Sequence, residues 1–537
     1  MEGPILHTIN NQDFIMKNRC FPISFSIFFY IASALPGAAP LRTGTASPEV
    51  AGIATDLSAF AQAEMKAQKV PGLAFALVQK DKVIFAEGYG VKSLGGSDPV
   101  GARTVFEVGS TTKAFTSALL GILVDRGRLQ WSDRVVSSFP RFRLWDSWAT
   151  REFRVDDLMA QWSGMPGYSL NMMALLGWTR DDLAAAVVSV RPVYSPRSQF
   201  SYVNTLWIWA GRLVERYSGL SWEEAMAREI LTPLGMRDST VDPRIVPFLN
   251  DAAAGHMVFP DGNVWRIPSD WPYRGWLDTF GPAGSLRSNV LDMSKWVRMH
   301  LSQGTFEGQR ILTAATLARL HAPRSLMSAE SARTLSYAQG WCYDVRPAGP
   351  VIWHNGGTAG MHSIVALYPA ADTGLVVLTN TDSNSIPEDM DARLYPLLFP
   401  GAAGRALSPT PAELAALNRI ALPGLIDSRE PPPLASATRG MTPPLPLARY
   451  TGRYSNPAYE TIQIRLKAGG LAAVVGPKQY ELPLAHLDGH TFSMTIPDWP
   501  QSESAVHFVF EDGENASRVQ FELFGDVREG WCERVEP

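Results

Sequence analysis

The stretch FEVGSTTKAFT, residues 106–116, decides how this sequence is interpreted. Ser110 and Lys113 stand three residues apart in it, at the expected start of a buried helix, and this spacing places both side chains on one face. The free N–H groups of the first turn disfavour a protonated Lys113, and burial lowers the pKa of the lysine further. Because a neutral lysine can accept the proton of a serine, the pattern predicts a serine nucleophile with a lysine base.

Two other short elements supply groups that suit the same chemistry. A lone Ser-x-x-Lys occurs by chance about once in a chain of this length, so such support is needed. Tyr202 and Asn204 flank one loop residue and point the same way in an extended loop, where the phenol can relay protons and the amide can hold the lysine and a substrate carbonyl. Residues 354–357, HNGG, end an apolar strand, where glycines let a substrate approach and an N–H can bind an oxyanion. Each element alone also fits an ordinary loop or turn, so the combination carries the signal.

Composition limits the classes of protein that the chain can belong to. Its 537 residues predict more than one domain, and 46% hydrophobic residues exclude wholesale disorder. The 48 basic and 52 acidic residues give a net charge of −4, which argues against nucleic acid as a partner. The 3 cysteines form no disulfide framework or metal cage, and Cys342 and Cys532 are expected as two separate thiols. The histidines lack metal-binding spacing, so we expect no metal and no organic cofactor.

The hydrophobic pattern predicts two folded regions of different class. Strands are expected within 72–90 and again within 351–379, with mostly helices and loops over 125–299 between them. Strands from both ends with helices between them predict one α/β (α+β) domain with a helical insertion. From residue 450 the period changes to two, which predicts about eight short strands in a small antiparallel β-barrel.

These patterns divide the chain into four parts. Residues 1–46, with translation starting at Met16, resemble an export signal with basic, apolar and small-residue regions in order, so we expect a periplasmic or secreted protein. An uncleaved N-terminal anchor is the alternative, and no other stable membrane span is expected. Residues 47–398 form the expected hydrolase domain, 399–447 a Pro-rich linker, and 448–537 the barrel.

The three elements in this order resemble the penicillin-recognising serine hydrolases, the group of class C β-lactamases and D-alanyl-D-alanine peptidases. The resemblance covers about residues 50–398, and the barrel resembles the lipocalin-like module found on many of these hydrolases. Further stretches similar to the family are Val70–Gly72, Asp125–Leu129, Leu158–Pro166, Thr232–Met236 and Pro282–Leu286.

The resemblance implies a β-lactamase/transpeptidase-like domain, an antiparallel sheet flanked by helices, and it assigns roles to the site residues. Ser110 becomes the acylated nucleophile, Lys113 its proton acceptor and Tyr202 the general acid or base. The N–H groups of Ser110 and Gly357 form the oxyanion hole, and His354 lines the cleft. The implied substrate-binding residues are Asn204, His354, Gly356 and Gly357.

Departures from the family pattern bear on the substrate. Where β-lactamases have Lys-Thr-Gly, this chain has His354-Asn355-Gly356, which removes a permanent charge for a substrate carboxylate. The usual His-Thr-Ser-Gly reads QWSG at residues 161–164. We therefore expect cleavage of small peptides first, including D-residue, cell-wall-type or linearised microcystin-type peptides. Ester cleavage is the alternative, followed by β-lactam hydrolysis and a non-catalytic penicillin-sensing module. The sequence makes no prediction of oligomeric state, and a lid over the cleft is the favoured role of the barrel.

Overall fold

The computed structural model describes residues 48–402 and 443–535, apart from 260, 331–332, 468, 500–501, 512–513, 526 and 528–529. The expected signal peptide at 1–46 and most of the expected linker at 399–447 lie outside these residues. Within the described ranges, no helix is both long and apolar enough to cross a membrane.

The first domain is built on an eight-stranded antiparallel sheet in the order β2-β1-β14-β13-β12-β11-β10-β9. Strands from the two ends of the domain lie side by side in this sheet, where β1 pairs with β14 from Leu73 opposite Thr379. The strands are β1 (Gly72–Gln79), β2 (Lys82–Gly90), β9 (Ser325–Glu330), β10 (Arg333–Tyr337), β11 (Cys342–Val345), β12 (Val351–Gly357), β13 (His362–Tyr368) and β14 (Thr373–Thr379). This arrangement confirms the predicted fold class.

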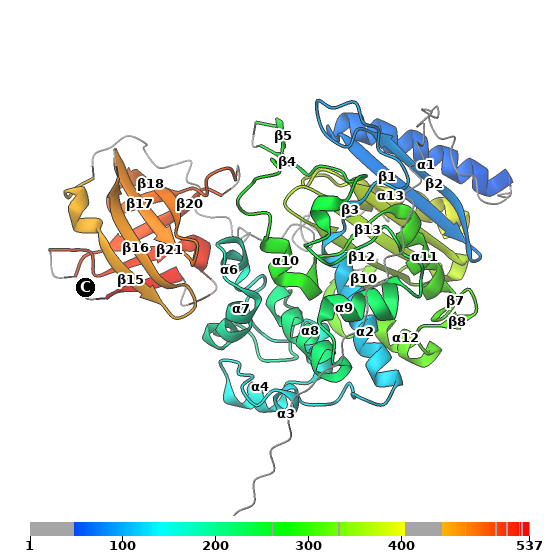
Figure 1. The fold of residues 1–537 in the computed structure, drawn as a ribbon, viewed down its shortest axis with the longest axis horizontal. Coiled ribbons are helices and arrows are strands. Elements are labelled where there is room, and N and C mark those ends of the chain that lie inside the picture. Colours follow the sequence, from blue (N-terminus) through cyan, green and yellow to red (C-terminus); the bar gives the residue numbers. More distant parts are fainter. Residues whose placement is uncertain are drawn as a thin grey trace, which may run out of the picture. The chain divides into compact units, whose positions relative to one another are not determined.

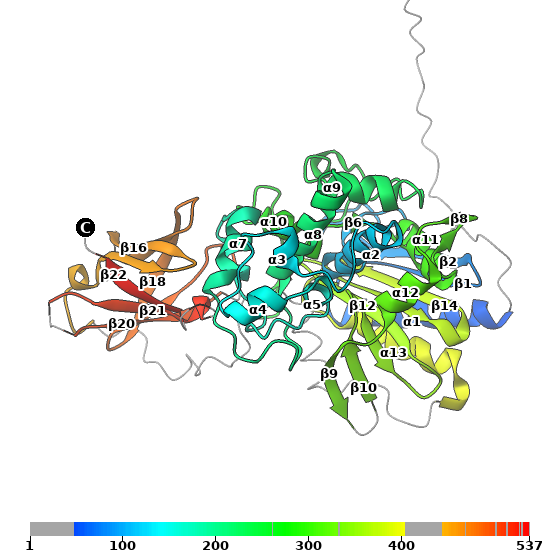
Figure 2. The same ribbon diagram turned by 90° about the horizontal axis from the view of Figure 1, so that it is seen from below.

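Helices cover both faces of this sheet. Helices α1 (Pro48–Ala67) and α13 (Ile386–Leu398) pack together on one face, and α2 (Thr112–Asp125) and α11 (Val290–Leu301) lie on the other (Figure 1 and Figure 2). The middle strands β12, β13 and β14 are buried along their whole length. Complete burial of this kind is typical of strands that are covered on both faces.

The helical insertion predicted between the two groups of strands is present. Its long helix α8 (Asn204–Ser218) packs against α2. Other helices of the domain are α3 (Val135–Ser138), α4 (Ser147–Glu152), α5 (Val155–Met159), α6 (Asn171–Leu175), α7 (Arg180–Ala186), α9 (Trp222–Met226), α10 (Trp276–Phe280) and α12 (Ala314–His321). Short two-stranded pairs join β3 (Phe106–Glu107) to β6 (Arg287–Ser288), β4 (His256–Val258) to β5 (Val264–Arg266), and β7 (Thr305–Phe306) to β8 (Gln309–Arg310).

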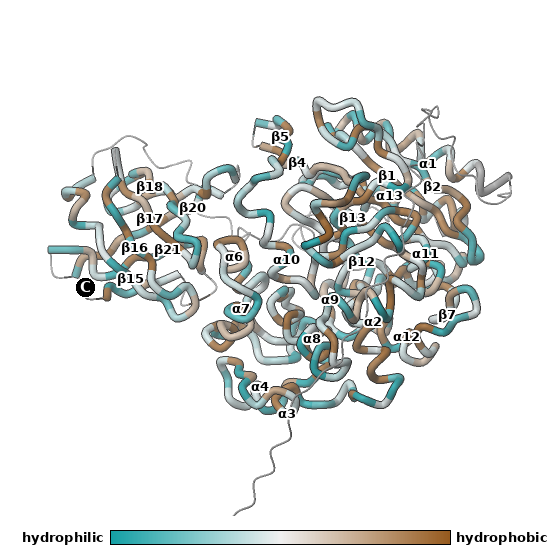
Figure 3. Tube along the Cα trace, in the orientation of Figure 1, coloured by the Kyte–Doolittle hydropathy of each residue, from teal (hydrophilic) through white to brown (hydrophobic). Residues whose placement is uncertain are grey.

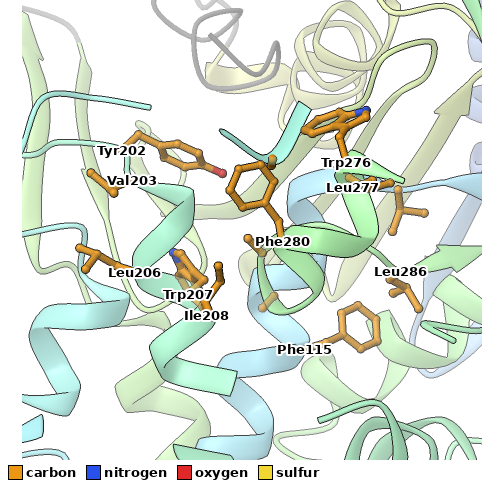
Figure 4. Packing of buried hydrophobic residues seen from close by; sticks show 14 of the residues in the cluster. Phe115, Tyr202, Val203, Leu206, Trp207, Ile208, Trp276, Leu277, Phe280 and Leu286 are labelled. Atoms are coloured by element: carbon orange, nitrogen blue, oxygen red, sulfur yellow. The ribbon is translucent and has the colours of Figure 1, made fainter. Parts of the chain in front are cut away.

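Helix α2 is the central helix of the domain and is buried from Thr112 to Leu123. Its Phe115 stacks on Trp296 of α11 with ring centroids 3.8 Å apart. Aromatic and aliphatic side chains from α8 and α10 belong to the same hydrophobic cluster as Phe115 (Figure 4). Thr116 donates to the carbonyl of Pro282 over 2.7 Å. A helix held on all sides in this way gives the residues at its start fixed positions.

The second domain is a closed antiparallel barrel of eight strands, as predicted. It closes where Arg453 of the first strand pairs with Val535 of the last. The strands are β15 (Gly452–Asn456), β16 (Glu460–Lys467), β17 (Gly470–Val475), β18 (Tyr480–Asp488), β19 (Thr491–Met494), β20 (Ser504–Val509), β21 (Arg518–Phe521) and β22 (Trp531–Val535). Hydrophobic residues run along these strands (Figure 3), and Tyr450, Phe492 and Phe508 fill the interior with ring centroids 5.1–5.5 Å apart. Cys342 and Cys532 are both buried and unpaired, which confirms two separate thiols.

The packing of α2 predicts a large cost for truncating Phe115. Phe115 is fully buried, so Phe115→Ala should lower the free energy of unfolding of the first domain by about 3–5 kcal/mol, because a buried ring is lost and a cavity is left. Urea unfolding followed by tryptophan fluorescence measures the change. Phe248→Ala is the matched control, since Phe248 is 77% exposed and its loss should cost less than about 0.5 kcal/mol. Equal effects of the two variants would contradict this account of the core.

Candidate active site

The start of α2 places the expected nucleophile. The chain leaves β3, turns at Gly109 with φ +53°, and passes through the 3₁₀ turn Gly109–Thr111 into the helix. Ser110 is 8% exposed and opens onto a cavity of about 20 Å³. The residues that line this cavity are Ser110, Asn204, Trp276, Leu277, Phe280, Ala283, Gly284 and Gly357. Three residues predicted from separate parts of the sequence, Ser110, Asn204 and Gly357, therefore lie around one cavity.

Lys113 lies directly behind Ser110 and is fully buried. Its Nζ is 3.0 Å from Ser110 Oγ, 2.7 Å from Asn204 Oδ1 and 2.8 Å from the carbonyl oxygen of Ala283. Burial holds the pKa of this lysine well below its usual range. A neutral amine has two N–H donors and one lone pair, and the amide and carbonyl oxygens can only accept. In the neutral form of the lysine, the two donors can serve Asn204 and Ala283, which leaves the lone pair for the hydroxyl of Ser110.

Tyr202 stands beside this pair and is also buried. The Nζ of Lys113 lies 4.7 Å from the centroid of its ring, and Figure 4 shows its hydroxyl directed towards Phe280 on the cavity wall. Burial raises the pKa of Tyr202 well above its usual range, and the nearby Ser110 only partly opposes this effect. The hydroxyl forms no hydrogen bond of normal geometry to any described residue. It is thus a neutral phenol whose hydroxyl has no hydrogen-bond partner among the described residues.

The end of β12 approaches the start of α2 unusually closely. A Cβ atom on Gly356 would collide with the carbonyl oxygen of Val108, and one on Gly109 would lie 2.9 Å from the nitrogen of Gly357. Ser363 of the neighbouring strand β13 also donates to the Val108 carbonyl over 2.8 Å. Because side chains are absent at these contacts, Ser110 and Gly357 share one cavity, as the expected oxyanion pair requires.

His354 lies behind the cavity and does not line it, in contrast to the expectation from the sequence. It is fully buried, with Nδ1 2.5 Å from the carbonyl oxygen of Asn355 and Nε2 3.0 Å from the hydroxyl of Tyr337. The carbonyl can only accept, so Nδ1 carries the hydrogen and Nε2 accepts from Tyr337. Burial, helped by Lys113, lowers the pKa of His354 to about 3. The side chain is therefore a neutral positioning group for Tyr337.

The sequence did not indicate that Gln161 fixes the loop that carries Tyr202. Gln161 accepts the N–H of Val203 at its side chain over 2.8 Å and the N–H of Ser201 at its carbonyl over 3.0 Å. It therefore fixes the loop on both sides of Tyr202. The altered QWSG sequence at 161–164 marked this position, but no sequence signal connected it to residues forty positions later.

A buried carboxylate supports the strand end in a similar way. Glu388 of α13 accepts from Asn355 over 2.7 Å and lies 3.1 Å from Nε2 of His362, the residue opposite Gly357. Burial opposes a charge on His362, but Glu388 and the carbonyl of Asn384 raise its pKa overall.

Within the residues that the structure describes, no three His, Cys, Asp or Glu side chains are grouped as metal ligands.

Comparison with known proteins agrees with this geometry. The Beta-lactamase family model matches residues 57–397, and a domain of unknown function (DUF3471) matches residues 436–534. The unguisins hydrolase ungD of Aspergillus violaceofuscus is 27% identical over 472 residues, which cover 80% of this chain and 81% of that protein. Penicillin-binding protein 4 of Amycolatopsis lactamdurans is 29% identical over 318 residues, 58% of this chain and 81% of that protein.

Solved structures show the same fold. The penicillin-binding protein homologue of Pyrococcus abyssi, described as octameric, aligns with a TM-score of 0.55 at 20% identity, over 89% of this chain and 99% of that one. SurE aligns with a TM-score of 0.53 at 19% identity, over 90% of this chain and 100% of that one. Because the family match covers well over half of its length, the chain belongs to the β-lactamase family and is a serine hydrolase of that fold.

Proposed function

We propose that this serine hydrolase is a peptidase that cleaves short or D-residue-containing peptides through an acyl-enzyme on Ser110. The observation that carries the mechanism is the contact set of Lys113, whose Nζ lies 3.0 Å from Ser110 Oγ and also contacts Asn204 Oδ1 and the carbonyl oxygen of Ala283. In the neutral lysine, the last two contacts can take both donors and leave the lone pair for Ser110. Such a lysine is a base already aimed at its proton. The likeness to a named hydrolase favours catalysis over penicillin sensing.

Acylation begins when Ser110 Oγ attacks the substrate carbonyl and its proton passes to Lys113. The carbonyl oxygen becomes an oxyanion between the N–H groups of Ser110 and Gly357. Tyr202 gives its proton to the leaving amine and recovers one from Lys113, so the C–N bond breaks and the acyl group stays on Ser110. Water then attacks the ester, Lys113 takes its proton, and Ser110 is released with its hydrogen restored.

The strand end supports a peptide as substrate. β11 covers β12 only from Val351 to Trp353, while β13 continues along it as far as Gly357. The backbone of residues 354–357 therefore has a ladder partner on one side only, next to Ser110. An extended peptide can add to such an edge through main-chain hydrogen bonds.

Two further parts of the proposal concern the substrate class and the compartment. The cavity wall of Trp276, Leu277 and Phe280 suits an apolar group beside the scissile bond. The neutral His354 offers no fixed charge to a lactam carboxylate, so cell-wall-type and linearised microcystin-type peptides rank above β-lactams.

The export pattern at residues 16–46 supports a periplasmic or secreted enzyme.

Ester cleavage is the second candidate, and a substrate panel separates the two. The panel contains D- and L-residue peptides, p-nitrophenyl esters and a chromogenic cephalosporin. We expect the largest kcat/KM for a peptide, less for esters and the least for the cephalosporin, with a fluorophosphonate adduct on the tryptic peptide that carries Ser110. Faster turnover of the cephalosporin than of every peptide and ester would overturn the peptidase proposal.

The base role of Lys113 predicts the pH dependence. A protonated lysine cannot accept the serine proton, so kcat/KM should fall as pH decreases through the pKa of Lys113, at a pH well below the ordinary lysine value. Lys113→Arg should lose about 10²–10⁴ in kcat/KM, because guanidinium stays protonated in proteins. Lys66→Arg, at an exposed position of α1, should match the wild type. An unchanged pH profile and rate in Lys113→Arg would transfer the base role to another group.

The donor role of Tyr202 predicts a difference between leaving groups. An amine must gain a proton to leave, whereas p-nitrophenolate leaves without one. Tyr202→Phe should therefore reduce peptide cleavage about 10²–10⁴-fold and p-nitrophenyl ester cleavage less than about tenfold. Tyr194→Phe serves as the control, because Tyr194 is 43% exposed. Equal losses for amide and ester would show that Tyr202 only shapes the site.

A further inference from the structure

A second cavity adjoins the one at Ser110 and shares a wall with it. It has a volume of about 70 Å³, and Trp276 lines both cavities. Its lining includes Ala359, Gly360 and Met361, which come two to four residues after the strand end at Gly357. A substrate that is bound at Ser110 and extends past Trp276 would enter this second cavity.

The charged side chains of this second cavity are mainly guanidiniums. Arg266 ends β5 and Arg274 precedes α10, and both line the cavity with exposed side chains. Arg274 donates to the carbonyl of Ser269 over 3.5 Å. Among the described residues, neither arginine forms an ion pair with a carboxylate within 4.0 Å.

One carboxylate also lines this cavity, and it is already paired. Glu107 lies 3.5 Å from the buried guanidinium of Arg287, which also contacts Asp278 at 2.6 Å. Glu107, Asp278 and Arg287 together carry two negative charges and one positive charge. Arg266 and Arg274 add two positive charges at the cavity. The surplus positive charge therefore lies on the two exposed arginines.

The position of the proton donors indicates which part of the substrate reaches this cavity. The leaving group must face Lys113 and Tyr202. Tyr202 packs towards His354, which precedes Gly357 on β12, with ring centroids 6.4 Å apart. Trp276 lies on the opposite side of Phe280 from Tyr202 (Figure 4), and residues 359–361 follow Gly357. The acyl part of the substrate, not the leaving group, therefore extends past Trp276.

We propose that Arg266 and Arg274 form a subsite for a carboxylate on the acyl part of the substrate. The planar guanidinium binds a carboxylate through two parallel hydrogen bonds, which makes arginine suited to this group. The carboxylate belongs to the acyl part because that part extends past Trp276, which lines both cavities. The proposal rests on the acyl-enzyme mechanism and narrows the substrate class to acidic acyl groups.

The test uses substrates that differ only in this charge. One pair consists of peptides with Glu or Gln at the residue before the one that carries the scissile carbonyl. The other pair consists of p-nitrophenyl esters of a dicarboxylic acid, with the distal carboxyl free or methylated. Wild type should prefer the charged member of a pair about fivefold or more in kcat/KM, mainly through KM. The preference should weaken as salt is added.

Variants assign the preference to the two arginines. Arg266→Gln and Arg274→Gln should each reduce the charged-to-neutral ratio, and the double variant should bring it to about one. Arg310→Gln, at an exposed position of β8, is the matched control and should keep the wild-type ratio. Equal rates for charged and neutral members in wild type, or a preference that survives the double variant, would overturn the subsite. If only the esters are cleaved, the peptidase proposal fails, while the ester pair still decides whether the subsite exists.

Discussion

A lysine amine enclosed by protein with no carboxylate beside it is the constraint on which the catalytic domain depends. The contacts of Lys113 are an amide oxygen, a carbonyl oxygen and a hydroxyl, and none of them compensates a full positive charge in a buried site. Burial therefore holds the pKa of Lys113 well below its usual range, and the base role proposed for it depends on the packing of α2, α8 and the 3₁₀ turn Gly281–Ala283 around it. The burial of α2 therefore contributes to the stability of the fold and also lowers the pKa of Lys113.

Close backbone contact is the second requirement, and the sheet provides it. The end of β12 reaches the turn before α2 only because Gly109 and Gly356 have no side chains at the contact. Glu388 supports the strand end by accepting a hydrogen bond from Asn355 and by lying 3.1 Å from Nε2 of His362. An oxyanion site made of backbone N–H groups needs this rigidity, because the donors must already be in place when the charge develops.

The sequence predicted the parts of this site whose signal is local. Ser110 and Lys113 share a helix face, and their spacing was sufficient to place them together. The stretch HNGG was expected at the end of an apolar strand, and β12 runs through it to Gly357, because pairing with β13 outweighs the low strand propensity of two glycines. β9 and β10 were missed altogether, since SLMSAE and RTLSY show no clear apolar alternation. The misplacement of His354 has the same origin: its partner Tyr337 lies seventeen residues away on a strand that the pattern did not reveal.

The pKa shifts of the buried side chains at the site determine where charge can form during the proposed reaction. Burial lowers the pKa of Lys113 and of His354 and raises the pKa of Tyr202 and of Tyr337, so it favours the neutral form of all four side chains. In the proposed mechanism, the first full charges then appear together, as the oxyanion and the lysine ammonium. Opposite charges formed a few ångströms apart in a low-dielectric site stabilise each other strongly. A permanent lysine in place of His354 would add a third charge beside Lys113 and oppose its protonation, so the histidine suits a mechanism in which Lys113 must accept a proton.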